Sequence, residues 1–181
     1  MSFYIIQKLK SINARIYLSI GGKIKKIINF TGGNKLDNET IKSLNELLQG
    51  EYMAIESFNN FISRLEDKSI KATFQDVQKQ HRKNTETLAN YIQNIGGRPD
   101  ENLGIKGKMG DIMINMELGS GSDDEVVEKA IEGETKGVNM AEKVLRGRLD
   151  EKSRDIAGEI LENDRKSIER LKILDKRQKK Q

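Results

Sequence analysis

The stretch IKSLNELLQGEYMAIESFNNFISRL, residues 41–65, repeats apolar side chains at intervals of three and four residues. The repeat consists of Ile41, Leu44, Leu48, Ile55, Phe58, Ile62 and Leu65. This spacing places one apolar stripe along a helix and is typical of a helix that packs in a bundle. We therefore predict a long amphipathic helix from about Glu39 to Glu66.

Three further stretches show the same spacing. Residues 69–95 carry it in Ile70, Phe74, Val77, Leu88, Tyr91 and Ile95, and Gly96-Gly97 and Pro99 mark the end of this helix. The third stretch opens with the capping-box pattern Ser122-Asp-Asp-Glu125 and continues through Val127, Ile131, Val138, Ala141 and Leu145. The fourth, about 153–174, uses Ala157, Ile160, Leu171 and Leu174. Between the last two, residues 150–153 favour a turn and a cap, with one continuous helix as the alternative.

About 25 glycine-rich residues separate the second stretch from the third. Two helices that run parallel in a bundle need such a long connection, whereas antiparallel neighbours need only a short loop. The sequence therefore predicts an all-α fold, an antiparallel four-helix bundle over residues 37–175 with a long crossover between its second and third helices.

Composition excludes several classes of function. The 181 residues include no cysteine, which excludes disulfides, thiolate metal sites and iron–sulfur clusters. No apolar run approaches the roughly 18–20 residues that span a bilayer, and the N-terminus does not resemble a signal peptide. We expect a cytoplasmic protein. No motif indicates a nucleotide or a haem.

The N-terminal segment, residues 1–36, contains seven Lys or Arg and no acid, whereas the other residues hold 25 basic and 28 acidic side chains. Ile5, Leu9, Ile12, Ile16 and Ile20 share one helical face, so we predict a basic amphipathic extension. Such a segment suits an anionic membrane surface, which would make the protein peripheral there, or a partner's groove. A surface helix on the bundle or a flexible extension is the alternative, and nucleic acid is a less typical partner. Residues 176–181 form a basic tail.

Each apolar seam is interrupted by polar residues near its middle. They are Glu51 in the first helix, His81 and Asn84 in the second, Glu134 in the third, and Asp164 and Ser167 in the fourth. Counted from the expected turns, the ionisable members lie at similar heights in the bundle. Burying three carboxylates together is costly without a cation, and a divalent metal is the usual solution in bundle cores. We therefore predict Glu51, His81, Glu134 and Asp164 as metal ligands. A buried hydrogen-bond network that fixes helix register, or partial exposure in a loosely packed core, is the alternative.

Several pieces of the sequence carry a family resemblance. They are Gly50-Glu-Tyr-Met-Ala54 with Phe58, the segment from Phe74 through His81 to Leu88, Ile95-Gly-Gly-Arg-Pro99, and Gly133-Glu134. In this order the chain resembles the ferritin-like superfamily of the rubrerythrin and bacterioferritin type over about residues 37–174. It also resembles an uncharacterised bacterial ferritin-like family of four-helix bundles.

The resemblance implies a metal site with fewer ligands than the superfamily's di-iron pattern. Glu51 and Glu134 match its two single glutamates. Its two Glu-x-x-His motifs fall on His81-x-x-Asn84 and Asp164-x-x-Ser167. The resemblance implies one or two divalent ions of iron, manganese or zinc, iron or peroxide handling or weak oxidase activity, and a homodimer through helix faces. One ion is easier to hold than two with four ligands. The alternative function is a non-enzymatic bundle that uses its basic arm for membrane or partner association.

Overall fold

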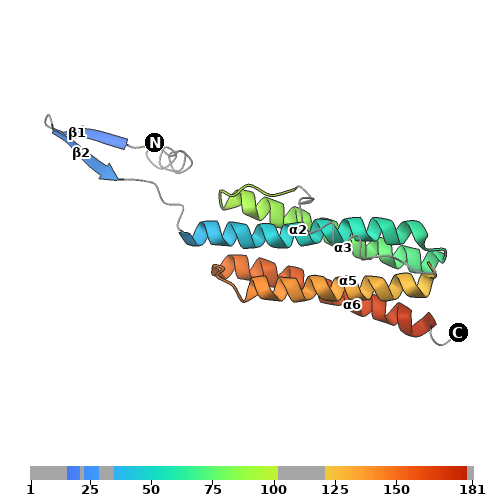
Figure 1. Ribbon diagram of the computed structural model, residues 1–181. Coiled ribbons are helices and arrows are strands. Elements are labelled where there is room, and N and C mark those ends of the chain that lie inside the picture. Colours follow the sequence, from blue (N-terminus) through green and yellow to red (C-terminus); the bar gives the residue numbers. More distant parts are fainter. Residues whose placement is uncertain (1–15, 21–22, 29–34, 102–120, 179–181) are drawn as a thin grey trace.

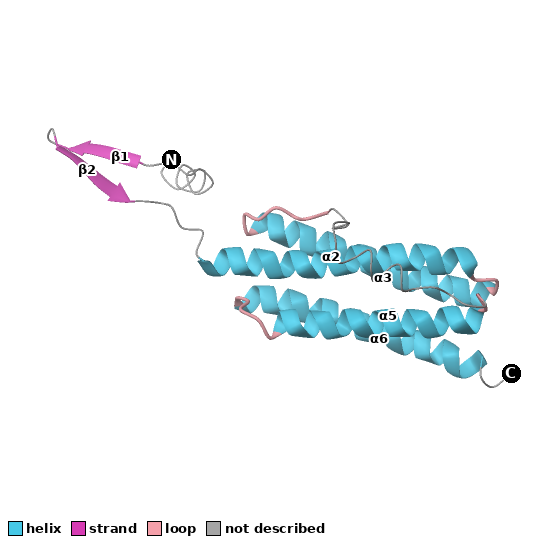
Figure 2. Cartoon of the chain, viewed as in Figure 1, coloured by secondary structure: helices cyan, strands magenta, loops and turns pink. Residues whose placement is uncertain are grey.

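The computed structural model describes residues 16–20, 23–28, 35–101 and 121–178. Four long α-helices lie side by side in Figures 1 and 2. They are α2 (Lys35–Arg64), α3 (Lys68–Asn94), α5 (Asp123–Leu145) and α6 (Glu151–Gln178). The predicted all-α four-helix bundle is confirmed, and the helices begin and end within a few residues of the predicted bounds.

Contacts at the two ends of the bundle show that α3 and α5 run parallel. The turn after α2 lies beside the start of α5, because the backbone N–H groups of Glu66 and Asp67 donate to the Asp123 carboxylate at 2.9 and 2.8 Å. The residues after α3 lie beside the early part of α2, since the N–H of Asp100 donates to Asn45 Oδ1 at 2.8 Å. The connection from 102 to 120, outside the described residues, therefore joins opposite ends of the bundle, as the crossover prediction requires.

Side-chain caps explain where the helices begin. Asp67 caps α3 by accepting from the N–H groups of Ser69 and Ile70 at 2.7 and 2.9 Å. Ser122 caps α5 as its sequence pattern predicts. Before α6, the N–H and hydroxyl of Ser153 donate to the Asp150 carboxylate at 3.0 and 2.5 Å. Each cap satisfies backbone groups that have no partner within the helix. The predicted break between α5 and α6 is thus confirmed over the alternative of one continuous helix.

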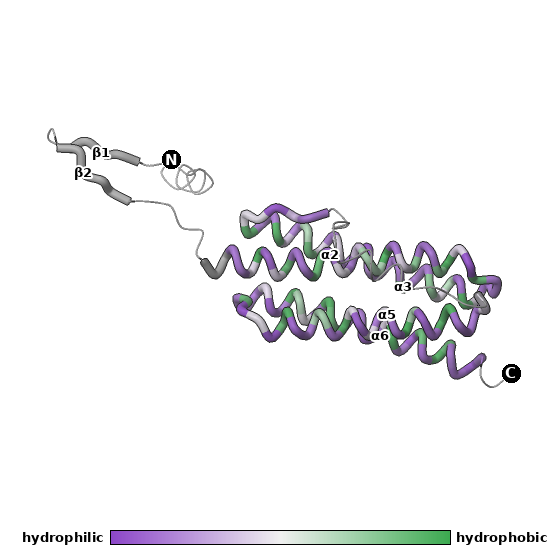
Figure 3. The backbone as a smooth tube through the Cα atoms, in the orientation of Figure 1, coloured by the Kyte–Doolittle hydropathy of each residue, from purple (hydrophilic) through white to green (hydrophobic). Residues whose placement is uncertain are grey.

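The predicted seams form the core. Figure 3 shows the alternation of apolar and polar positions along each helix. One apolar cluster, which includes Leu48, Leu88 and Ile160, fills one half of the bundle. A second cluster around Phe58 and Phe74 fills the other half. The interrupting polar residues lie between these halves, so the layer they form is held by packed side chains on both sides.

The N-terminal residues correct one prediction. Two strands, β1 (Ile16–Ile20) and β2 (Lys23–Ile28), pair antiparallel as a hairpin, with Ile20 opposite Lys23. The predicted helical face is therefore wrong at Ile16 and Ile20, and its other members lie outside the described residues. Positions four apart share a face in a strand as well as in a helix. The β-branched isoleucines and the intervening Gly-Gly dipeptide favour the hairpin.

The division into an arm of residues 1–36, a bundle of 37–175 and a tail of 176–181 stays a prediction, as does the membrane surface as the arm's partner. Helix α6 continues through the first half of the predicted tail, to Gln178. Among the helices described, none has an apolar stretch of the length and purity that a bilayer crossing requires.

Two glycines give a test of the packing around α3 and α6. A Cβ at Gly97 would lie 2.8 Å from Ile92 Cγ2 and 2.9 Å from Ile41 Cγ1, whereas a Cβ at Gly158 in α6 meets nothing within 4 Å. Gly97→Ala should therefore lower the free energy of unfolding by about 1–3 kcal/mol through overpacking. Gly158→Ala should raise it by about 0.5–1 kcal/mol through helix propensity. Urea denaturation measures both variants, and shifts of the same sign would contradict the packing described.

Candidate metal centre

A layer of four ionisable side chains crosses the middle of the bundle, one from each helix. Glu51 comes from α2, His81 from α3, Glu134 from α5 and Asp164 from α6. Their residues are only 2–6% exposed to solvent. The structure thus brings together all four residues that the seam positions single out, and their role as metal ligands stays a prediction.

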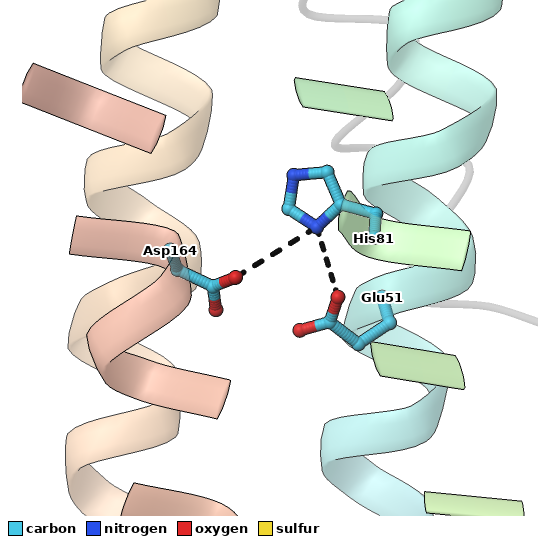
Figure 4. A group of neighbouring side chains, drawn as sticks. All are labelled: Glu51, His81 and Asp164. Atoms are coloured by element: carbon cyan, nitrogen blue, oxygen red, sulfur yellow. Dashed lines mark hydrogen bonds and ion pairs between the residues drawn. The ribbon is translucent and has the colours of Figure 1, made fainter. Parts of the chain in front are cut away.

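His81 is the centre of this layer. Its Nδ1 lies 2.8 Å from Glu51 Oε2 and 3.8 Å from Asp164 Oδ1. Figure 4 marks both contacts with dashed lines. Its other ring nitrogen, Nε2, lies 3.0 Å from Glu134 Oε1. One imidazole therefore separates two carboxylates on its Nδ1 side from one carboxylate on its Nε2 side.

The charge of His81 is set by these neighbours. Burial by itself lowers the pKa of His81, but the charges and hydrogen bonds of Glu134 and Glu51 outweigh it and raise the pKa well above 6.5. At neutral pH the ring is an imidazolium that donates from both nitrogens. The protein thus supplies its own cation to the carboxylates when no metal is bound.

Asp164 behaves differently from an ordinary aspartate. Burial, followed by the negative charge of Glu51, raises the pKa of Asp164 to about 9, and the positive charge of His81 opposes this only in part. A side-chain hydrogen bond with Glu51 contributes in the same direction. Asp164 is therefore a neutral acid at physiological pH in the metal-free layer.

Asn84, one helical turn after His81, holds two of the carboxyl groups. Its Nδ2 donates to Glu51 Oε2 and to Asp164 Oδ1, each at 3.1 Å. Its Oδ1 accepts from Gln80 Nε2 at 3.0 Å and from Asn163 Nδ2 at 3.4 Å, which fixes the orientation of the amide. The sequence marks Asn84 as a polar seam residue, but Gln80 and Asn163 lie beside the seams and give no such signal. Ser167, the last polar seam residue, donates to the backbone oxygen of Asn163 instead.

Aromatic rings close one side of the layer. The Phe58 ring lies 5.7 Å from the His81 ring, centroid to centroid, and packs against Phe61 and Phe74 at 5.8 and 5.3 Å. Phe58 and Phe74 are at most 1% exposed. These rings cover one side of the imidazole, and the low local dielectric around them strengthens the electrostatic interactions within the layer.

The donor set fits one divalent ion. Glu51, His81 and Asp164 each offer a ligand atom, and these atoms lie within 4.8 Å of one another. Ligands bonded to one ion at about 2.0–2.2 Å are separated by roughly 3–4 Å, so small movements would suffice. One imidazole and two carboxylates suit iron, manganese or zinc. Glu134 is not in this group, because it contacts the far nitrogen of His81.

The same contacts also satisfy the layer without a metal, because the imidazolium and the Asn84 amide supply donors to the carboxyl oxygens. A closed network of this kind matches the alternative reading of the seam residues, in which the polar layer fixes the register of the helices. Buried polar networks are stabilising only when their members are satisfied, and here the four ionisable residues all have partners.

Comparisons with known proteins agree with this fold. The model of a family described as Domain of unknown function (DUF2383) matches residues 39–147. The search of curated proteins found no match.

Solved structures of ferritin-like proteins are similar over most of the chain. A bacterioferritin-related protein from Bacteroides fragilis, described as a dodecameric thioferritin, shares 16% identity with a TM-score of 0.65, covering 80% of this chain and 89% of that one. A ferritin-like diiron-carboxylate protein from Bacillus anthracis shares 19% identity with a TM-score of 0.59, covering 78% and 99%. Dps from Staphylococcus aureus shares 19% with a TM-score of 0.60, covering 75% and 94%. These likenesses confirm the ferritin-like fold.

Proposed function

For this chain, which belongs to the family described as Domain of unknown function (DUF2383), we propose the binding of one divalent metal ion in the bundle core and a role in iron handling. The observation that carries the proposal is the buried group of Glu51, His81 and Asp164, whose ligand atoms lie within 4.8 Å of one another. The description of a structural neighbour as a diiron-carboxylate protein supports iron as the ion. Manganese and zinc suit the same donors and serve as comparison ions.

The residues around the three ligands have separable roles in this proposal. Glu134 accepts from His81 Nε2 and leaves Nδ1 directed at Glu51 and Asp164. A carboxylate that holds the outer nitrogen of a metal-binding histidine fixes the ring orientation and makes it a better ligand. Asn84 holds the two ligand carboxyl groups in place. Iron bound there would supply redox chemistry towards dioxygen or peroxide.

The proposal predicts unequal effects for the two glutamates. Glu51→Gln removes a ligand and should weaken binding of ferrous iron at least about a hundredfold, whereas Glu134→Gln removes the support of His81 and should weaken it about 10–100-fold. Anaerobic calorimetric titration of metal-free protein measures the affinity and the number of ions per chain, which should be one for the wild type. Glu132→Gln, at an exposed glutamate of α5, is the matched control. Unchanged binding by Glu51→Gln would refute the proposal.

The second candidate function is a non-enzymatic bundle in which the layer only fixes helix register. The completeness of the hydrogen-bond network favours it, since each of the four residues has a partner without a metal. Under this account, metal-free protein would show no saturable uptake of iron, manganese or zinc. Assembly through helix faces is a proposal that either function accommodates, and the description of the Bacteroides fragilis protein as dodecameric supports an oligomer.

A further inference from the structure

A cavity of about 370 Å³ lies between α2 and α5 and reaches the polar layer. Its walls include Leu47, Met53, Phe58 and Phe61 from α2 and Met140 from α5, and its inner end is formed by the four residues of the layer. Cavities of roughly 300–1,000 Å³ with apolar walls and few polar groups are typical of small-molecule sites. This space is therefore large enough for an organic ligand, beyond a metal ion alone.

The cavity is open because small residues occupy the facing sides of α2 and α5. Gly50 and Ala54 line it from α2, and Ala130, Gly133 and Gly137 line it from α5. A Cβ at Gly137 would meet nothing within 4 Å, and a Cβ at Gly50 would meet only the tip of Met140, at 3.5 Å. Larger side chains at Gly50, Ala54 and Gly133 would reduce the volume of the cavity.

Glu134 supplies a polar anchor at the inner end. It is 6% exposed and lines the cavity. Its Oε1 lies 3.0 Å from His81 Nε2. A carboxyl group that lines an otherwise apolar cavity favours a ligand that brings a hydrogen-bond donor.

The charges at the two ends of the cavity limit the ligand further. Carboxylates at the inner end repel an anion, and a full positive charge would lose its hydration among apolar walls. At the mouth, Glu132 already pairs with Lys136 at 2.7 Å and with Lys129 at 3.6 Å. An uncharged ligand with an apolar body therefore meets both conditions.

We infer that this cavity binds a small, uncharged organic molecule with an apolar body and a terminal hydroxyl, the body against Phe58 and Phe61 and the hydroxyl donating to Glu134. The inference builds on the proposed function by naming a ligand for the same centre. Binding needs no metal in this account, so the two proposals are tested separately in metal-free and metal-loaded protein.

Phenol, toluene and benzoate are the probes for this site. In calorimetric or NMR titrations of the metal-free full chain, phenol should bind saturably and about tenfold more tightly than toluene, because one hydrogen bond to a charged acceptor is worth roughly that factor. Benzoate should not bind. No saturable binding of phenol, or equal affinities for phenol and toluene, would overturn the inference.

Substitutions that fill the cavity test whether phenol binds there. Ala54→Phe should abolish phenol binding, and Ala54→Leu, a smaller intrusion, is the second variant if the first folds poorly. Ala72→Phe places the same side chain on an exposed position of α3 and should bind phenol like the wild type. Phenol binding that survives both substitutions at Ala54 would overturn the inference. Loss of phenol binding with iron binding retained supports it, and phenol binding by a chain that takes up no metal would refute the proposed function alone.

Discussion

Replacing His81 by alanine is expected to lower the melting temperature of the metal-free protein by about 6–20 °C at neutral pH. The ring donates to Glu51 and Glu134 and is the cation of the layer. Its removal leaves buried carboxylates without an opposite charge, and breaking a buried ion pair in this way typically costs about 3–5 kcal/mol. For a chain of this size each kcal/mol shifts the melting temperature by about 2–4 °C.

Circular dichroism at 222 nm during heating measures this effect, with Gln80→Ala as the control. Gln80 is a half-buried neighbour on α3 that reaches the layer only through Asn84. A saturating divalent metal should not rescue His81→Ala fully, because a proposed ligand is missing as well. A loss below about 1 kcal/mol would mean that the layer does not depend on the imidazolium.

Metal affinity is expected to rise by up to about a hundredfold per pH unit between pH 6 and 7.5. The pKa of His81 is well above 6.5 and that of Asp164 is about 9, so both groups carry protons in this range. Both must lose them before Nδ1 and the carboxylate can bind an ion, and each released proton contributes up to tenfold per unit. Manganese titrations in buffers of different ionisation enthalpy count the protons. An affinity independent of pH would contradict the assignment of these two ligands.

The same protons affect the stability of the metal-free protein in the opposite direction. Its free energy of unfolding should fall as pH rises, whereas metal affinity should increase. The folded-state pKa of His81 is raised, so its stabilisation is full below about pH 6.5 and is lost as pH rises through that pKa. The raised pKa of Asp164 acts with the same sign, because from its usual value of 3.8 up to about 9 the folded state holds a proton that the unfolded chain has released. The free energy of unfolding should therefore fall from pH 5 to pH 9, and less steeply in Asp164→Asn.

Much of the fold was predictable because each seam is regular. The steps of three and four residues through Leu44, Leu48 and Phe58 describe one helical face, and all three side chains are buried. The crossover followed from chain length alone, since parallel helices cannot be joined by a short loop. The pairing of β1 with β2 was missed because a four-residue period fits one face of either a helix or a strand.

The candidate site was predictable as a set of residues but not as a set of roles. Interruptions of the seams identified Glu51, His81, Glu134 and Asp164, because a polar residue at a buried position is conspicuous in any apolar repeat. Which ring nitrogen each carboxylate meets depends on side-chain rotamers, which the spacing does not encode. Glu134 is predicted as a ligand with the other three, and in the structure it lies on the far side of the imidazole from the other carboxylates, so its role as a ligand stays a prediction.

The spacing of apolar residues also does not predict the cavity between α2 and α5. From the sequence alone, glycine in a helix indicates a weak helix former or a site where two helices approach closely. Here the small residues Ala54 and Gly133 face a space that neighbouring side chains do not fill. Such space depends on the distance between two helices, which helix periodicity does not define.

One ion should bind between Glu51, His81 Nδ1 and Asp164 while Glu134 keeps its contact with Nε2. Anomalous diffraction from crystals soaked with manganese at pH 8 tests it most directly. We expect one peak per chain, about 2.0–2.2 Å from an atom of each of the three ligands. Two peaks with Glu134 as a ligand, or no peak with the hydrogen-bond network intact, would contradict it.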